Sequence, residues 1–136
     1  MKIAVVGTGY VGLVTGTCFE ETGNKVTCVD IDKNKVEKLS GGQITIYEPG
    51  LEKIFLRNIK ESRLQFTTQL EEAVEDAAAL IIATEWSGFR TPDFERMENE
   101  IKHKIIFDGR NLFDVKRMPE LGYNYFSIGR AESNKA

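Results

Sequence analysis

Several features that mark large classes of proteins are scarce in this sequence of 136 residues. Its two cysteines, Cys18 and Cys28, are too few for the disulfide framework of a small secreted domain. Neither adjoins a base that would activate a thiolate, so we expect both to be buried apolar residues. The single histidine, His103, lies in a charged segment without partner ligands, so we expect no metal site.

Long apolar runs and an excess of positive charge are also missing. No run approaches the ~20 apolar residues that a membrane-spanning helix needs. The chain enters a strand-like segment at once instead of presenting a signal peptide. A net charge of −3 and a pI near 5.3 argue against nucleic acid as the main partner. These absences favour a cytoplasmic protein that binds neither membranes nor nucleic acid.

A short apolar run at residues 2–6 leads directly into three glycines. The run is β-branched and short, as expected for a strand buried on both faces. Gly7 allows a tight turn, Gly9 lets a diphosphate approach the backbone, and Gly12 lets the next helix pack closely. The amides and positive dipole end of that helix, near Val11, would face the phosphates. The spacing predicts a dinucleotide-binding turn.

A second apolar run ends in an acidic residue. Asp30 follows Gly12 by 18 residues, close to the ~20 expected for a carboxylate that binds the adenosine ribose. Such a carboxylate accepts a hydrogen bond from the 2′-hydroxyl of NAD and repels the 2′-phosphate of NADP, so we expect NAD. Lys35 could neutralise phosphate charge nearby. Two alternatives stay open. The glycine turn could be purely structural, with Asp30 capping the next turn, and Lys35 could be a solvated helix lysine without a ligand.

Strand-like and helix-like segments alternate along the chain. We expect strands at 2–6, 25–29, 64–66, 79–83, 104–107 and 123–127, and helices at 11–22, 33–39, 51–60, 70–76, from Thr91, and at 115–120. Asp32 is expected to cap the second helix, and Glu48 to favour the dipole of the third. Right-handed crossovers then predict an α/β fold with one doubly wound, mostly parallel, six-stranded Rossmann-like sheet in the order 3-2-1-4-5-6, spanning residues 1–136 as a single domain.

Two groups of motifs carry a resemblance to a known family. The Gly-Tyr-Val-Gly-Leu turn, Val29–Asp32 with Lys35, and Ile46–Leu51 resemble the beginning of the UDP-glucose/GDP-mannose dehydrogenase family. Thr84–Trp86, Phe89–Arg90, Pro92–Phe94 and Ile106–Asn111 resemble its C-terminal end. Residues 1–70 are thus similar to the family's NAD-binding half and residues 77–130 to its UDP-sugar-binding half, with a junction near 70–79.

The resemblance implies an oxidoreductase reaction, the oxidation of UDP-glucose to UDP-glucuronate by two NAD through a cysteine-bound thioester. The family's central portion, with its catalytic cysteine motif, has no counterpart here, and Cys18 and Cys28 match nothing in it. Without a thiol held in attack geometry, the second oxidation has no covalent route. We therefore assign no catalytic residue, leave open whether the chain is an enzyme, and expect no turnover by the chain alone.

The resemblance also implies a set of cofactor-binding residues. They are Gly7, Gly9, Tyr10, Val11, Gly12, Asp30, Lys35 and Thr84. Thr84 also belongs to the C-terminal pattern, so its contact with the cofactor stays open. Arg110 matches an arginine that contacts the nucleotide sugar, and a guanidinium suits a diphosphate. Its alternative is a surface pair with Asp108 or Asp114. Trp86 could stack on a base or simply pack.

Three functions are compatible with these motifs. An NAD-binding module, with at most weak binding of a UDP-sugar, is the leading hypothesis. A regulatory nucleotide-binding domain and a scaffold that binds nothing are the alternatives. Loss of the family's central dimerisation segment would expose surface, so self-association as a homodimer is a further prediction.

Overall fold

The computed structural model describes residues 1–84 and 94–130. Its strands are β1 (Lys2–Val6), β2 (Lys25–Val29), β3 (Leu64–Thr67), β4 (Ala79–Ile82), β5 (Ile105–Asp108) and β6 (Asn124–Ser127). Its helices are α1 (Tyr10–Glu21), α2 (Lys33–Ser40), α3 (Leu51–Lys60), α4 (Leu70–Val74), α5 (Phe94–Glu100) and α6 (Arg117–Glu120). The expected helix start at Thr91 and the loop with Trp86 lie outside the described residues. None of the helices described is long and apolar enough to cross a membrane.

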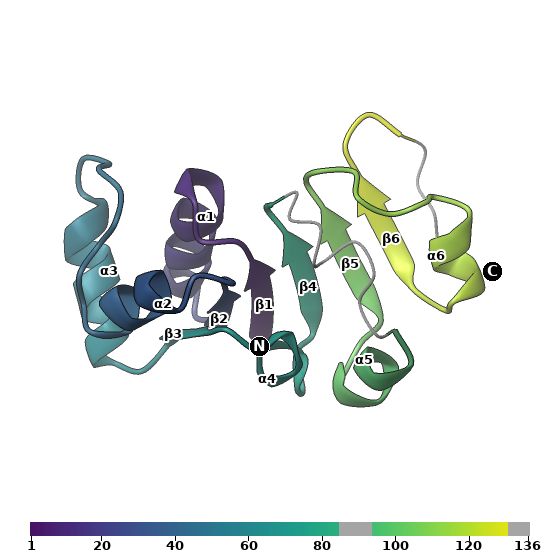
Figure 1. Ribbon diagram of the computed structural model, residues 1–136, viewed down its shortest axis with the longest axis horizontal. Helices are drawn as coiled ribbons and strands as arrows, with labels where there is room; N and C mark the ends of the chain where they lie inside the picture. The colour runs from purple at the N-terminus through teal and green to yellow at the C-terminus, as the bar shows by residue number, and fades with distance from the viewer. Residues whose placement is uncertain (85–93, 131–136) are drawn as a thin grey trace.

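The six strands form one sheet in the order β3-β2-β1-β4-β5-β6, and all neighbouring strands are parallel (Figure 1). This confirms the predicted doubly wound fold. Val6 pairs with Val29 on one side and with Ile82 on the other, so the carboxyl ends of the three central strands lie level. The order of the strands reverses between β1 and β4. In open α/β sheets, ligands bind at the carboxyl ends of the strands at this position.

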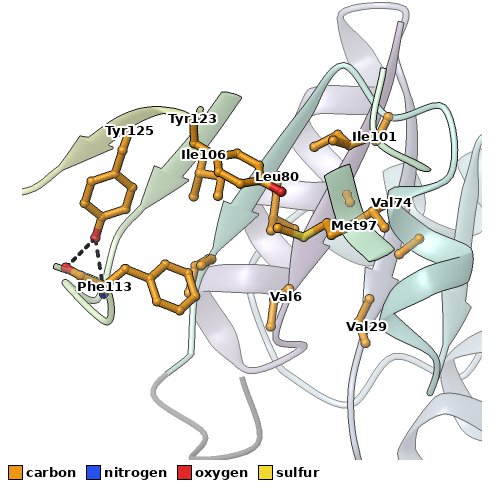
Figure 2. Close-up of a cluster of buried hydrophobic side chains, with 14 of the residues drawn as sticks. Val6, Val29, Val74, Leu80, Met97, Ile101, Ile106, Phe113, Tyr123 and Tyr125 are labelled. Carbon is orange, nitrogen blue, oxygen red and sulfur yellow. Dashed lines mark hydrogen bonds between the residues drawn. The ribbon is translucent and has the colours of Figure 1, made fainter. Parts of the chain in front are cut away.

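Alternate side chains of the strands enter two apolar clusters, one on each face of the sheet. Val6 belongs to the cluster that α4, α5 and α6 cover (Figure 2). Val5 belongs to the cluster covered by α1, α2 and α3, which contribute Leu13, Leu39 and Phe55. In Figure 1, α1, α2 and α3 lie beside the β3–β2–β1 half of the sheet. The central strands are therefore buried on both faces, as short β-branched runs predict.

Two buried tyrosines complete the first cluster at β6. Tyr123 and Tyr125 are both fully buried, and Figure 2 shows the Tyr125 hydroxyl against the backbone of Phe113. Burial raises the pKa of Tyr123 to about 12. Burial, together with the hydrogen bond to Asp108, also raises the pKa of Tyr125. Both phenols therefore stay neutral inside the core.

Helix α1 is held by packing, because its glycines and threonines give it a poor helix propensity. At Gly16 the helix lies so close to β2 that an added Cβ would come within 2.9 Å of the Cys28 sulfur. Cys28 is buried as predicted, whereas Cys18 is exposed, so the prediction for Cys18 was wrong. The reason is its position on the helix, since Gly12, Gly16 and Glu20 form the buried face.

Candidate cofactor-binding site at the glycine turn

The glycine turn joins β1 to α1 at the position where the strand order reverses. Gly7 has φ +108°, a backbone conformation that side-chain-bearing L-residues rarely adopt. Its amide donates to the carbonyl of Val29 at 2.8 Å. A Cβ added at Gly12 would lie 2.1 Å from the carbonyl oxygen of Gly7. Both positions therefore require glycine for reasons of backbone geometry.

The N-terminus of α1 is open beside Gly9. Gly9 is the N-cap residue, with no side-chain cap, and a Cβ added there would meet no atom within 4 Å. The first intrahelical hydrogen bond runs from the Leu13 amide to the Gly9 carbonyl at 2.9 Å. The amides of Tyr10, Val11 and Gly12 therefore precede the helical hydrogen-bond ladder. No acidic side chain lies in this first turn, so its amides and positive dipole can attract an anion.

Asp30 lies directly after β2 and faces the glycine turn, where it is fully buried. Its Oδ2 accepts a hydrogen bond from the Thr8 hydroxyl and lies 3.7 Å from Lys35 Nζ. Its Oδ1 accepts from the Asp32 amide at 2.9 Å. Thr8 is a partner that the sequence analysis missed. A hydroxyl residue between Gly7 and Gly9, next to an acid at the end of the adjacent strand, was the available signal.

The first turn of α2 brings Lys35 to this carboxylate. Asp32 is the N-cap of α2, and its Oδ1 accepts from the Lys35 amide at 3.1 Å, which confirms the predicted cap. The Lys35 side chain is 29% exposed, whereas the Asp30 side chain is wholly buried. Lys35 thus lies between the buried carboxylate and the surface, where an incoming ligand could displace it.

The loop between α2 and α3 extends to the glycine turn. The hydroxyl of Tyr10 donates to the carboxylate of Glu48, and this hydrogen bond raises the pKa of Tyr10. Helix α3 begins only at Leu51, with Gly50 as its N-cap. The expectation that Glu48 favours the dipole of this helix was therefore wrong, because its carboxylate binds Tyr10 instead. A pocket of about 480 Å³ lies between the loop and α3.

Thr84 follows β4 and lies against the other side of the turn. A Cβ added at Gly7 would be 3.0 Å from the Cβ of Thr84. This proximity follows from the pairing of β4 with β1. Since β2 and β4 flank β1 on opposite sides, Asp30 and Thr84 lie on either side of the glycine turn.

Arg110 lies one strand further along the same edge, after β5, and its side chain is exposed. The buried carboxylate of Asp108 accepts from the backbone amides of Arg110 at 2.9 Å and Leu112 at 2.7 Å. It also accepts from the Tyr125 hydroxyl at 2.5 Å. Asp108 therefore shapes the loop that carries Arg110 through backbone contacts.

Nucleophiles and metal ligands do not gather at the glycine turn in the described part of the chain. Among residues 1–84 and 94–130, no group of three or more His, Cys, Asp or Glu side chains is placed to hold a metal ion. Cys28 is buried, and burial raises the pKa of its thiol. Cys18 is exposed in the second half of α1, away from the glycine turn. Neither thiol is placed to attack a ligand bound there.

Comparison with known proteins relates this geometry to a family. Residues 1–105 match the family model of the NAD-binding domain of the UDP-glucose/GDP-mannose dehydrogenase family. UDP-glucose 6-dehydrogenase TuaD of Bacillus subtilis is 52% identical over 114 residues, which is 84% of this chain and 25% of that protein. UDP-glucose 6-dehydrogenase of Pseudomonas aeruginosa is 48% identical over 83 residues, 61% of this chain and 18% of that protein. The chain thus spans about a quarter or less of these relatives.

Solved structures agree with this relationship. UDP-N-acetyl-mannosamine dehydrogenase Cap5O of Staphylococcus aureus superposes with a TM-score of 0.72 at 26% identity, covering 99% of this chain and 38% of that one. A GDP-mannose dehydrogenase of Pseudomonas aeruginosa, at 22% identity, has the same fold with a TM-score of 0.73. The match covers 98% of this chain and 37% of that one. The glycine turn and Asp30 lie within the residues that match an NAD-binding domain, and that match indicates NAD as the cofactor of the domain. The chain belongs to the UDP-glucose/GDP-mannose dehydrogenase family.

Proposed function

We propose that the open space beside Gly9, between the glycine turn and Asp30, is a crevice that binds the diphosphate of NAD over the first amides of α1. The observation that carries this proposal is the open space at Gly9, directly beside the N-terminus of a twelve-residue helix. The amides of Tyr10, Val11 and Gly12 supply donors, and the dipole of α1 favours the negative charge. Gly7 and Gly12 hold the turn in the shape that leaves this space open.

Asp30 is the proposed partner of the adenosine ribose. Its carboxylate already faces the glycine turn, and at 3.7 Å from Lys35 Nζ the pair with Lys35 is the longest of its contacts. Movement of Lys35 would free an acceptor position on Oδ2 for a ribose hydroxyl and would bring the ammonium towards the phosphates. The bond from the Thr8 hydroxyl to Oδ2 would hold the carboxylate in place. Thr84, on the far side of Gly7, would then flank the nicotinamide half.

Titration calorimetry with NAD and NADP tests this assignment. We expect NAD to bind more tightly than NADP, because a carboxylate at Asp30 repels the 2′-phosphate. Asp30→Asn should weaken NAD about tenfold, since a charged acceptor contributes roughly 1–1.5 kcal/mol more than a neutral one. Asp32→Asn is the matched control, because Asn caps a helix as well as Asp does. Equal NAD affinity in the wild type and Asp30→Asn would contradict the role of Asp30, and binding of ATP but not NAD would support the regulatory alternative.

We further propose that this chain by itself does not oxidise UDP-glucose. Two observations support this, the absence of the family's catalytic cysteine motif from the sequence and the positions of Cys18 and Cys28 away from the crevice. A nucleophilic thiol has to be held in attack geometry for the second oxidation. The expected result is no multiple-turnover formation of NADH, measured at 340 nm with the pure chain, NAD and UDP-glucose. Sustained NADH formation would refute it.

Weak binding of a UDP-sugar through Arg110 and homodimer formation remain proposals. Support for the first is the exposed position of Arg110 at the ligand-binding edge of the sheet. Homodimer formation is supported by an apolar sheet face at β5 and β6. There Phe107 is 45% exposed and its ring stacks on that of Phe126, with 5.1 Å between the ring centroids. The joining of two half-domains near residues 70–79 is likewise a proposal, and the family match to residue 105 includes this segment.

A further inference from the structure

A buried carboxyl group lies at the C-terminal end of α1. Glu20 is fully buried, and neither of its carboxyl oxygens has a well-formed hydrogen bond among the described residues; the backbone of Val26 is a weak contact that favours the ionised form. The hydroxyl of Thr17, one helical turn earlier, and the Nε of Arg63 are also buried without a partner. Buried polar atoms are nearly always hydrogen-bonded, so a group of such atoms at one interface requires an explanation.

Four ionisable groups determine the electrostatic environment of Glu20. Arg63, between α3 and β3, favours the ionised carboxylate. Glu21 on α1 and Glu61 at the end of α3 disfavour it. The buried thiol of Cys28 on β2 also interacts with Glu20. Arg63 is the only cation in this group, so it is the natural counter-ion of Glu20.

Arg63 is turned towards other partners in the structure. Its Nη2 pairs with the carboxylate of Glu61 and donates to Asn58 Oδ1 at 3.2 Å. Asn58 in turn donates to the backbone carbonyl of Thr17 at 3.4 Å, which connects α3 to α1. The Nε of Arg63 takes no part in these contacts and remains a buried donor. The Nε is therefore a donor of this guanidinium that is left for a further partner.

Burial keeps Glu20 protonated over an unusual range of pH. Desolvation, opposed in part by Arg63, raises the pKa of Glu20 from 4.5 to about 8. A carboxyl that stays protonated brings no charge into this interface, where it has no well-formed hydrogen bond. Above pH 8 the same interface would have to accommodate a buried negative charge.

We propose that Glu20 is a proton switch that controls how firmly α1 is packed on β2 and α3. While the Glu20 carboxyl is protonated, α1 stays packed against β2 and α3 as in the structure. On ionisation, Glu20 takes the Nε of Arg63 as its counter-ion, and the contacts of Arg63 with Glu61 and Asn58 weaken. This device belongs to the fold and does not depend on whether the crevice binds NAD.

The sign of the pH dependence follows from linkage. The unfolded chain loses the Glu20 proton near pH 4.5, whereas the folded chain keeps it to about pH 8. The unfolding equilibrium constant should therefore rise between these values, by up to about tenfold per pH unit from this single group, and level off above pH 8. Urea denaturation from pH 5.5 to 8.5 measures this slope. Glu20→Gln, which is neutral at every pH, should remove it, and Glu21→Gln, an exposed carboxyl paired with Arg57, should not.

A carbon-13 NMR titration of the Glu20 carboxyl in the wild-type chain gives a second measurement that needs no folded variant. We expect a midpoint well above 6, and a higher midpoint in Arg63→Met, because loss of the guanidinium removes the group that favours ionisation. A midpoint below 5, or an unchanged slope in Glu20→Gln, would overturn the switch. An unchanged midpoint in Arg63→Met would overturn the assignment of Arg63 as the counter-ion.

Discussion

Gly12→Ala is expected to destabilise the fold by about 3 kcal/mol or more, the upper end of the range for overpacking. The added Cβ would lie 2.1 Å from the carbonyl oxygen of Gly7 and 2.7 Å from its carbonyl carbon. Both atoms belong to the backbone, so no side-chain rotation can relieve the clash. Relief would require α1 to move away from the turn, and this would disturb the apolar contact between Leu13 and the sheet.

Urea denaturation monitored by circular dichroism measures this effect. Gly41→Ala is a suitable control, because Gly41 ends α2 with φ −82° and an added Cβ there would meet Glu37 O at an ordinary 3.4 Å. It should change the free energy of unfolding by no more than about 0.5 kcal/mol. A Gly12→Ala variant as stable as Gly41→Ala would show that the turn does not have the geometry described.

Gly9→Ala is expected to do the opposite, sparing the fold and removing the cofactor. Gly9 has φ −71°, which any residue adopts, and an added Cβ would meet no protein atom within 4 Å. The cost to stability should be about 1 kcal/mol or less, the cost of a poorer N-cap residue. The same methyl group would occupy the space proposed for the diphosphate. Loss of two amide hydrogen bonds to a charged group corresponds to about a 100-fold loss of NAD affinity.

Calorimetric titration of NAD into Gly9→Ala, with its urea midpoint determined in parallel, separates binding from folding. Gly41→Ala serves again as the control, since Gly41 lies at the end of α2, outside the crevice, and should leave NAD affinity unchanged. Wild-type affinity in a folded Gly9→Ala variant would place the diphosphate somewhere other than the N-terminus of α1.

The fold could be predicted from the sequence because its signals are local. Runs such as residues 2–6 and 79–83 are short, apolar and bounded by glycine or polar residues, which is typical of strands buried on both faces. Right-handed crossovers, together with the dinucleotide-binding turn, then favour the order 3-2-1-4-5-6. The glycine turn was equally accessible, because the roles of Gly7 and Gly12 depend on backbone geometry within a single β-turn-α unit.

The contacts that shape the crevice were not predicted, because they join segments far apart in the chain. Thr8 and Asp30 are 22 positions apart, and Tyr10 and Glu48 are 38 positions apart. The face of α1 that carries Gly12 and Gly16 packs on the sheet as expected, but a helix rich in glycine and threonine has no clear apolar stripe that would place its other residues. This explains the wrong prediction for Cys18. The burial of Glu20 contradicts the usual pattern, in which a carboxylate at a helix end lies in water.

The most direct test of the proposed crevice is a crystal structure of this chain grown with saturating NAD. We predict the diphosphate over the amides of Tyr10, Val11 and Gly12, beside Gly9. We predict a ribose hydroxyl on the carboxylate of Asp30, with Lys35 moved from its present position. A structure in which the dinucleotide is bound elsewhere, or in which Asp30 keeps only Thr8, Asp32 and Lys35 as partners, would contradict this account.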